Sequence, residues 1–241
     1  MGISYFGYSA NPADGDTLDD SAAVVWTPPA SMQAGDFVVV YVSQRDPGST
    51  ITNSTTGGQT WSAGTAVASG SQQVRRFTTT YNGSWSANPA FDTSFRNGLR
   101  FSAVGIVFRP TGTPTWATDV AQANGNDTPS TPFDVVAAGQ TAVAASTVTI
   151  ACWFNTSFGG EPFSLQTGGW TNPGSVSQFR NANGAGNDIT LSLAYKINTV
   201  AGATGDVTNR MTQSITTLWM IETFKDQSVG SSTNYNMLKG M

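Results

Sequence analysis

The sequence predicts an all-β protein, a jelly-roll-like antiparallel β-sandwich made of two related meanders that face each other across one core, with little or no helix. Short runs of β-branched and aromatic residues recur between clusters of Gly, Pro, Asn and Ser, which is typical of strands and turns. No segment keeps the apolar spacing of an amphipathic helix beyond a turn or two, so nothing supplies the helical crossovers that parallel strands require. The second half of the chain also repeats the order of strands and aromatic corners of the first half.

Eight segments carry the strand pattern. In the last but one, Ile189, Leu191 and Leu193 alternate with polar residues, as in a strand with one buried face. The runs "FVVVYV", "RFSAVGIVF" and "TLWMIETF" are apolar on both faces, so we expect these strands to lie centrally and to be covered on both sides. The expected strands are residues 22–27, 36–44, 73–83, 98–110, 131–137, 147–155, 189–198 and 215–225.

Each half contains a Gly-Gly followed by a Trp, in "GGQTW" ending at Trp61 and in "TGGW" ending at Trp170. The interpretation we favour is structural: the glycines permit a sharp turn, and the indole then packs at the edge of the sandwich. The alternative is that exposed indoles stack on a ligand such as a sugar ring. The candidates for such stacking are Trp61, Trp170, Trp85 and Trp116.

Charged residues make up only 11% of the chain, against about 25% in an ordinary soluble domain. This sparse charge argues against a cytosolic enzyme and suits a protein that stays in a large assembly or faces the outside. The net charge of −4 disfavours binding to nucleic acid, and the "VRR" at Arg75 and Arg76 is too small a basic patch to read it. No apolar run approaches the length of a membrane-spanning helix, so we expect no membrane insertion.

The absence of histidine excludes Ser-His-Asp and Cys-His nucleophiles and any metal site with histidine ligands. The single cysteine, Cys152, cannot form an intramolecular disulfide and is expected to be a buried thiol. Only two glutamates exist, Glu161 and Glu222, whereas a jelly-roll glycosidase needs two carboxylates facing across a groove. Glu222 shares a strand face with apolar residues, so we expect a structural carboxylate, either at a strand end or paired with an Arg. The sequence therefore predicts neither an enzyme nor a cofactor.

Four carboxylates cluster in "DGDTLDD" near the N-terminus, at Asp14, Asp16, Asp19 and Asp20. Such a cluster can attract Ca²⁺, but an EF-hand loop would need Gly at its sixth position and Glu at its twelfth. The corresponding residues are Asp19 and Val25. We therefore favour a solvated turn, with a metal site as the alternative. The Asn-Gly segments at 124–127 and 181–188 are also interpreted as turns.

The quoted segments together resemble a known family. "AGDFVVVYVSQRDPGSTIT", "GGQTWS", "TTTYNGS", "FSAVGIVFRP", "TVTIACWF", "GGWT" and "LSLAYKI" are similar to a β-sandwich of virion proteins from tailed bacteriophages, over about residues 22–226. The first corner departs from that pattern because Gln59 and Thr60 separate Gly from Trp.

The resemblance implies a non-enzymatic structural protein located in the virion, either a capsid decoration (cement) protein or a tail or fibre component. It would adhere to major capsid or tail subunits and form a homo-oligomer, with a trimer expected by analogy. Alternatives are a receptor- or carbohydrate-binding adhesin of a tail fibre, and a jelly-roll glycan-degrading enzyme that uses Glu222.

The expected organisation is an N-terminal arm over 1–21, one β-sandwich domain over 22–226 and a polar C-terminal arm over 227–241. The C-terminal segment is rich in Gly, Ser and Asn and has too few apolar residues to form a core of its own. If a neighbouring subunit holds it, Met237 and Leu238 are the candidate contacts.

Overall fold

The all-β fold predicted from the sequence is confirmed. The computed structural model describes residues 2–11, 23–45, 49–93, 101–112, 115–157, 162–173, 179–181 and 188–227. These residues form strands, turns and loops, and none of them lies in a helix. Among them there is accordingly no helix that could cross a membrane.

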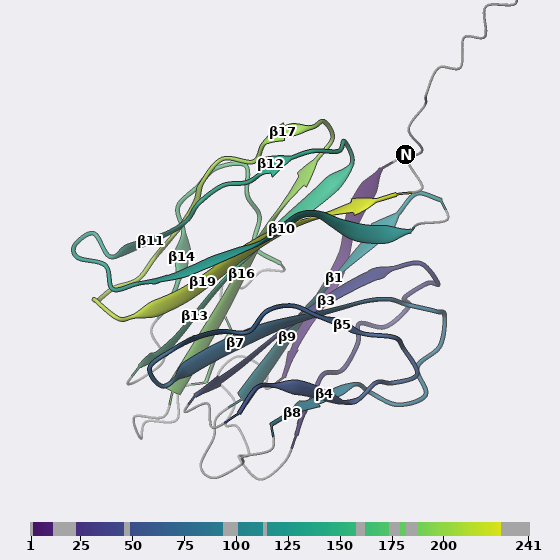
Figure 1. Cartoon of the computed structure of the whole chain (residues 1–241), viewed down its shortest axis with the longest axis horizontal. Helices are drawn as coiled ribbons and strands as arrows, with labels where there is room; N and C mark the ends of the chain where they lie inside the picture. Colours follow the sequence, from purple (N-terminus) through teal and green to yellow (C-terminus); the bar gives the residue numbers. More distant parts are fainter. Residues whose placement is uncertain are drawn as a thin grey trace, which may run out of the picture.

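Two large antiparallel sheets form the centre of the molecule, and each is built from one half of the chain (Figure 1). In the N-terminal sheet the strand order is β1-β9-β3-β7-β5, and β6 also pairs with β7. Its strands are β1 (Ile3–Asn11), β3 (Phe37–Arg45), β5 (Ser62–Ala63), β6 (Val67–Ser69), β7 (Gln72–Thr80) and β9 (Phe101–Pro110). In the C-terminal sheet the order is β10-β19-β13-β16-β15. Its strands are β10 (Trp116–Asp127), β13 (Thr147–Ser157), β15 (Phe179–Asn181), β16 (Asp188–Asn198) and β19 (Thr217–Asp226).

A small outer sheet covers the far side of each large sheet. The order β2-β8-β4 in the first half corresponds to β11-β18-β14 in the second. Their strands are β2 (Val24–Val25), β4 (Thr52–Thr55), β8 (Ala90–Asp92), β11 (Asp134–Ala137), β14 (Ser164–Leu165) and β18 (Val207–Arg210), and β12 (Thr141–Ala142) pairs separately with β17 (Gly202–Ala203). From β1 to β5 successive strands alternate between the large and the outer sheet, and β7, β8 and β9 do so again, so each half has the crossing connections of a jelly roll rather than the hairpins of the predicted meander.

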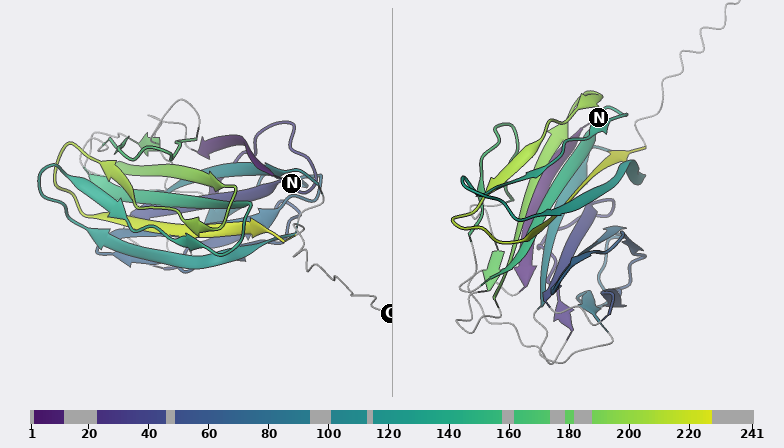
Figure 2. Two further views of the ribbon diagram at one scale, coloured as in Figure 1. Left: turned by 90° about the horizontal axis from the view of Figure 1, so that it is seen from above. Right: turned by 60° about the vertical axis from the view of Figure 1, so that its left-hand side comes forward.

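The molecule is therefore two jelly rolls packed through their larger sheets (Figure 2). Three layers of apolar side chains result. Phe37, Val39 and Tyr41 of β3 face the central core and meet residues of β13, β16 and β19. Val38 and Val40 of the same strand face the core under β2 and β8. This two-sided burial explains why β3 is apolar at every position from Phe37 to Val42, as the sequence predicts for a central strand.

The relation between the two halves is visible in matching strands. In the first half the central strand β3 pairs with β7 and β9. In the second half β13 pairs in the same way with β16 and β19. Trp61 directly precedes Ser62, which pairs with Thr78 of β7. Trp170 likewise precedes Thr171, which forms a bridge to Tyr195 of β16. The two Gly-Gly-Trp corners therefore occupy equivalent places.

Two expectations about individual segments are wrong. Residues 3–11, assigned above to an N-terminal arm, form the edge strand β1 and pair with β9 along its length. Residues 124–127, interpreted above as a turn, lie in β10, where Gly125 is opposite Trp219 of β19. A Cβ on Gly125 would lie 2.8 Å from the indole, so this glycine makes room for a packed ring rather than for a bend.

Candidate ligand-binding site

The four tryptophans that the sequence offers as stacking residues do not lie in a row. Trp170 is only 6% exposed and packs in the core under the C-terminal outer sheet. Trp116 stacks on Phe37 with ring centroids 4.5 Å apart, and its Nε1 donates to the carbonyl of Gly35 at 3.1 Å. Only Trp61 and Trp85 come together, with centroids 6.4 Å apart. Trp170 and Trp116 therefore pack as structural residues. Trp61 also packs against aromatic neighbours, but in addition it lines a cavity.

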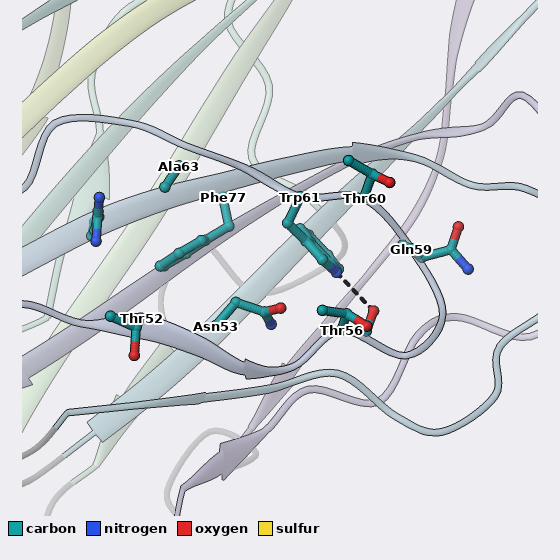
Figure 3. A pocket seen from close by; sticks show the side chains of 9 residues that line it. Thr52, Asn53, Thr56, Gln59, Thr60, Trp61, Ala63 and Phe77 are labelled. Atoms are coloured by element: carbon teal, nitrogen blue, oxygen red, sulfur yellow. Dashed lines mark hydrogen bonds between the residues drawn. The ribbon is translucent and has the colours of Figure 1, made fainter.

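Trp61 lines a cavity of about 490 Å³ on the outer side of the N-terminal sheet, between β4 and the β5–β7 edge (Figure 3). Figure 3 shows the rings of Trp61 and Phe77 next to each other, with Asn53 of β4 facing them. The lining residues are Thr52, Asn53, Thr56, Gln59, Thr60, Trp61, Ala63, Arg75 and Phe77. This size lies within the range of small-molecule sites, about 300–1,000 Å³.

The corner that carries Trp61 is held by its own hydrogen bonds. Gly57 and Gly58 have φ angles of 65° and 82°, a left-handed conformation that glycine adopts without strain. Gln59 then ties the corner to the loop after β7, because its Nε2 donates to Asn82 Oδ1 at 3.1 Å and its Oε1 accepts from the Asn82 amide at 3.0 Å. The Trp61 Nε1 donates to the carbonyl of Thr56 at 2.8 Å, so the indole is fixed in its plane.

Arg75 gives the cavity a positive charge. Its Nε donates to the carbonyl of Gly64 at 2.9 Å and its Nη1 to the carbonyl of Ile51 at 2.5 Å. The guanidinium lies 5.5 Å from the centroid of the Phe77 ring. Burial, and then repulsion from Arg76, lower the pKa of Arg75, yet an arginine stays charged at any ordinary pH. Within the described part of the chain no carboxylate forms an ion pair with it.

Asn53 adds an unusual polar group to the wall formed by β4. Its Nδ2 donates to the carbonyls of Thr55 and Ala90, both at 3.0 Å. Its Oδ1 is buried and has no hydrogen-bond partner among the described residues. A buried acceptor without a donor is costly, and this oxygen is closed to solvent, so Asn53 contributes an unsatisfied polar atom inside the wall rather than an open acceptor.

Glu222 is buried and paired rather than exposed to solvent. It is 3% exposed and sits between the two large sheets. Arg76 Nη2 donates to its Oε1 at 2.9 Å, as the expected pairing with an Arg requires, and Thr118 Oγ1 donates to the same atom at 3.3 Å. Burial raises the pKa of Glu222, while Arg76 and Thr118 act in the opposite direction. The Glu222 carboxylate therefore links the two large sheets through Arg76.

The remaining candidates contribute no site that can be described. No group of three or more metal-binding side chains occurs among the described residues. Asp14, Asp16, Asp19 and Asp20 lie outside those residues, as do Met237 and Leu238. Cys152 is buried in the central core, and burial raises the pKa of its thiol well above the ordinary value.

Sequence reasoning identified Trp61 but missed Asn53, Arg75 and Phe77 as its neighbours in the cavity. Phe77 and Arg75 fall in the expected strand 73–83, but no pattern indicates that polar β4 lies beside it. Comparisons of the chain with protein-family models, with curated proteins and with solved structures find no match.

Proposed function

We propose that this chain is a non-enzymatic structural protein of a bacteriophage virion, a capsid decoration or tail-associated component that adheres to neighbouring virion subunits. The observation that carries the proposal is the pair of jelly rolls joined face to face, since the jelly roll is an architecture of viral capsid proteins. The same architecture occurs in lectins, so the fold supports an adhesive role more directly than a particular place in the virion.

Two exposed valines support adhesion. β12 pairs with β17, and Ala142 lies opposite Gly202. The loop after β12 and the loop before β17 are therefore at the same end of this pair. These loops carry Val143 and Val200, which are 73% and 70% exposed. Exposed apolar side chains favour a contact with another protein, and a virion subunit is the partner we propose.

The proposal is tested by mixing the purified chain with intact virions and with capsids stripped of their decoration proteins. Size-exclusion chromatography with light scattering first gives the oligomeric state of the free chain, for which we expect a homo-oligomer. We then expect uptake at a fixed ratio to the capsid or tail subunits, and weaker uptake by a variant lacking residues 228–241 or carrying Val143→Ser with Val200→Ser. If neither capsids nor tails take up the full chain, the virion role is wrong.

Carbohydrate binding is a second candidate function because of one observation, the cavity beside Trp61. A fixed indole next to polar side chains is a setting in which the apolar face of a sugar ring can pack while its hydroxyls form hydrogen bonds. This function is compatible with a virion protein that contacts a cell surface.

A further inference from the structure

We propose that the cavity beside Trp61 binds a sugar ring that carries a carboxylate, of the hexuronate class, with the ring against Trp61 and the carboxylate on Arg75. This inference deepens the carbohydrate-binding candidate and does not depend on a location in the virion. Three features of the cavity support it.

The first feature is a rigid aromatic surface. The indole of Trp61 is held by its hydrogen bond to Thr56, by the edge-on contact with Phe91 at 5.7 Å and by the stacking on Trp85. It is nevertheless only half-buried, and it lines the cavity. A ring that is already fixed loses little conformational entropy when a ligand packs on it, so most of the contact energy is available for binding.

The second feature is the unbalanced charge of Arg75. Arg76, Arg109 and Arg210 each form an ion pair with a carboxylate of the chain. Arg75 instead uses Nε and Nη1 to bind two backbone carbonyls, which fix its guanidinium plane but leave its charge without an anion among the described residues. Guanidinium groups bind carboxylates through strong charge-assisted hydrogen bonds. A ligand carboxylate would supply the missing anion.

The third feature is the polar wall of the cavity. Thr52, Asn53 and Thr60 line it with polar side chains, and the Thr52 hydroxyl, which donates to the carbonyl of Asp92 at 3.3 Å, can still accept a hydrogen bond. Sugar hydroxyls can both donate and accept hydrogen bonds and so match this mixed set. A simple carboxylic acid would satisfy Arg75 but would leave the indole surface and the wall without contacts. The combination therefore favours an acidic sugar over a small organic anion.

The test is isothermal titration of the full chain with glucuronate and galacturonate, with glucose as the neutral ring and with acetate as the anion without a ring. We expect the hexuronates to bind more tightly than glucose or acetate, and their affinity to fall with added salt. Equal affinity for hexuronate and glucose would show that Arg75 does not bind the ligand carboxylate. Equal affinity for acetate would reduce it to an anion site, and no binding by any probe at millimolar concentration would overturn the proposal.

Variants separate the two halves of the proposed contact. Arg75→Gln should weaken hexuronate binding by about 10- to 100-fold and remove the preference over glucose. Lys196→Gln, which removes one positive charge from the other half of the molecule, should leave binding unchanged. Trp61→Ala should lower the affinity for both rings, and Trp61→Phe provides a milder change if Ala impairs folding. Hexuronate binding by Arg75→Gln at the original affinity would contradict the inference.

The readouts of the two proposals are independent. The virion role is measured by uptake onto particles, whereas the sugar site is measured on the purified chain alone. Failure of the titration would therefore leave the structural role in place, and failure of particle uptake would leave the sugar site in place.

Discussion

Arg76 of β7 and Glu222 of β19 form a buried ion pair between sheets that come from opposite halves of the chain. Arg76 Nε lies 2.7 Å from Glu222 Oε2, and the two side chains are 8% and 5% exposed. The Arg76 guanidinium also lies 5.3 Å from the centroid of the Phe224 ring. Because both charges have left water, the attraction between them largely offsets the cost of desolvation rather than adding much net stability.

Removing one member of this pair should destabilise the protein strongly. Arg76→Met leaves the Glu222 carboxylate buried without its cation, and we expect the free energy of unfolding to fall by about 3 to 5 kcal/mol. Urea denaturation followed by tryptophan fluorescence measures the change. The double variant Arg76→Met with Glu222→Leu removes both charges and should recover most of the loss. A double variant less stable than Arg76→Met would show that the pair itself, and not the unpaired charge, determines stability.

Glu222 should also give the stability a distinctive pH dependence. Burial raises its pKa above the ordinary value of 4.5, so between 4.5 and the folded pKa the folded state binds more protons than the unfolded state. The stability contributed by this group is therefore fully present below pH 4.5 and is lost as the pH rises through the folded pKa. The difference in unfolding free energy between the wild type and Glu222→Gln should accordingly decrease from pH 4.5 upward.

A second carboxylate provides the control for this pH series. Hydrogen bonding to Arg210 lowers the pKa of Asp134 below its ordinary 3.8, so its contribution is lost only as the pH falls below that value. Asp134→Asn should therefore leave the slope above pH 4.5 unchanged. If the difference between wild type and Glu222→Gln instead grows with pH, the direction of the Glu222 shift is wrong.

Gly105 in β9 is required for the position of Trp26. A Cβ at this position would overlap the indole of Trp26, which is fully buried under the N-terminal outer sheet. Gly105→Ala should lower the free energy of unfolding by at least about 1 to 3 kcal/mol through overpacking. Gly168→Ala is the matched control, because no atom lies within 4 Å of the Cβ it would add. Combining Gly105→Ala with Trp26→Leu should recover part of the loss, and equal effects of the two alanine variants would contradict this account.

The strands that sequence reasoning predicted well are those whose burial is visible in their own residues. β3, β9 and β19 are covered on both faces, so their sequences are mostly apolar and their central places in the sheets could be foreseen. β4 reads Thr-Asn-Ser-Thr and is mostly exposed, and nothing in such a sequence indicates pairing with β8. Its position depends on a partner almost 40 residues away, and local pattern does not contain that information.

The two tryptophan corners show the same limit for the candidate site. Trp61 and Trp170 share a motif and an equivalent place in their halves, yet Trp170 is buried and Trp61 lines a cavity. The difference comes from the residues around them: Trp170 packs against the core with Phe163, whereas Trp61 faces β4 across an open space. A motif could identify both tryptophans, but only the fold could show that Trp61 lines a cavity and Trp170 does not.

The two jelly rolls should not be stable apart. The central core takes Phe37, Val39 and Ile106 from the first half and Ile150, Leu193 and other apolar residues from the second, all of them buried. Cutting the chain between residues 113 and 114 would expose one face of each large sheet to water. It would also leave Arg76 and Glu222 without each other. At about 25 cal/mol per Å² of apolar surface, this loss outweighs the stability that a small outer core can supply.

We therefore expect residues 1–113 or 114–241 expressed alone to aggregate or to lack a cooperative unfolding transition. Expressed together, the two fragments should associate as a one-to-one complex with the near-ultraviolet circular dichroism of the intact chain. The same complex assembled with Arg76→Met in the first fragment should dissociate more readily, because its partner then carries an unpaired buried carboxylate. A monomeric fragment that unfolds cooperatively by itself would mean that the outer core, and not the shared central one, stabilises each half.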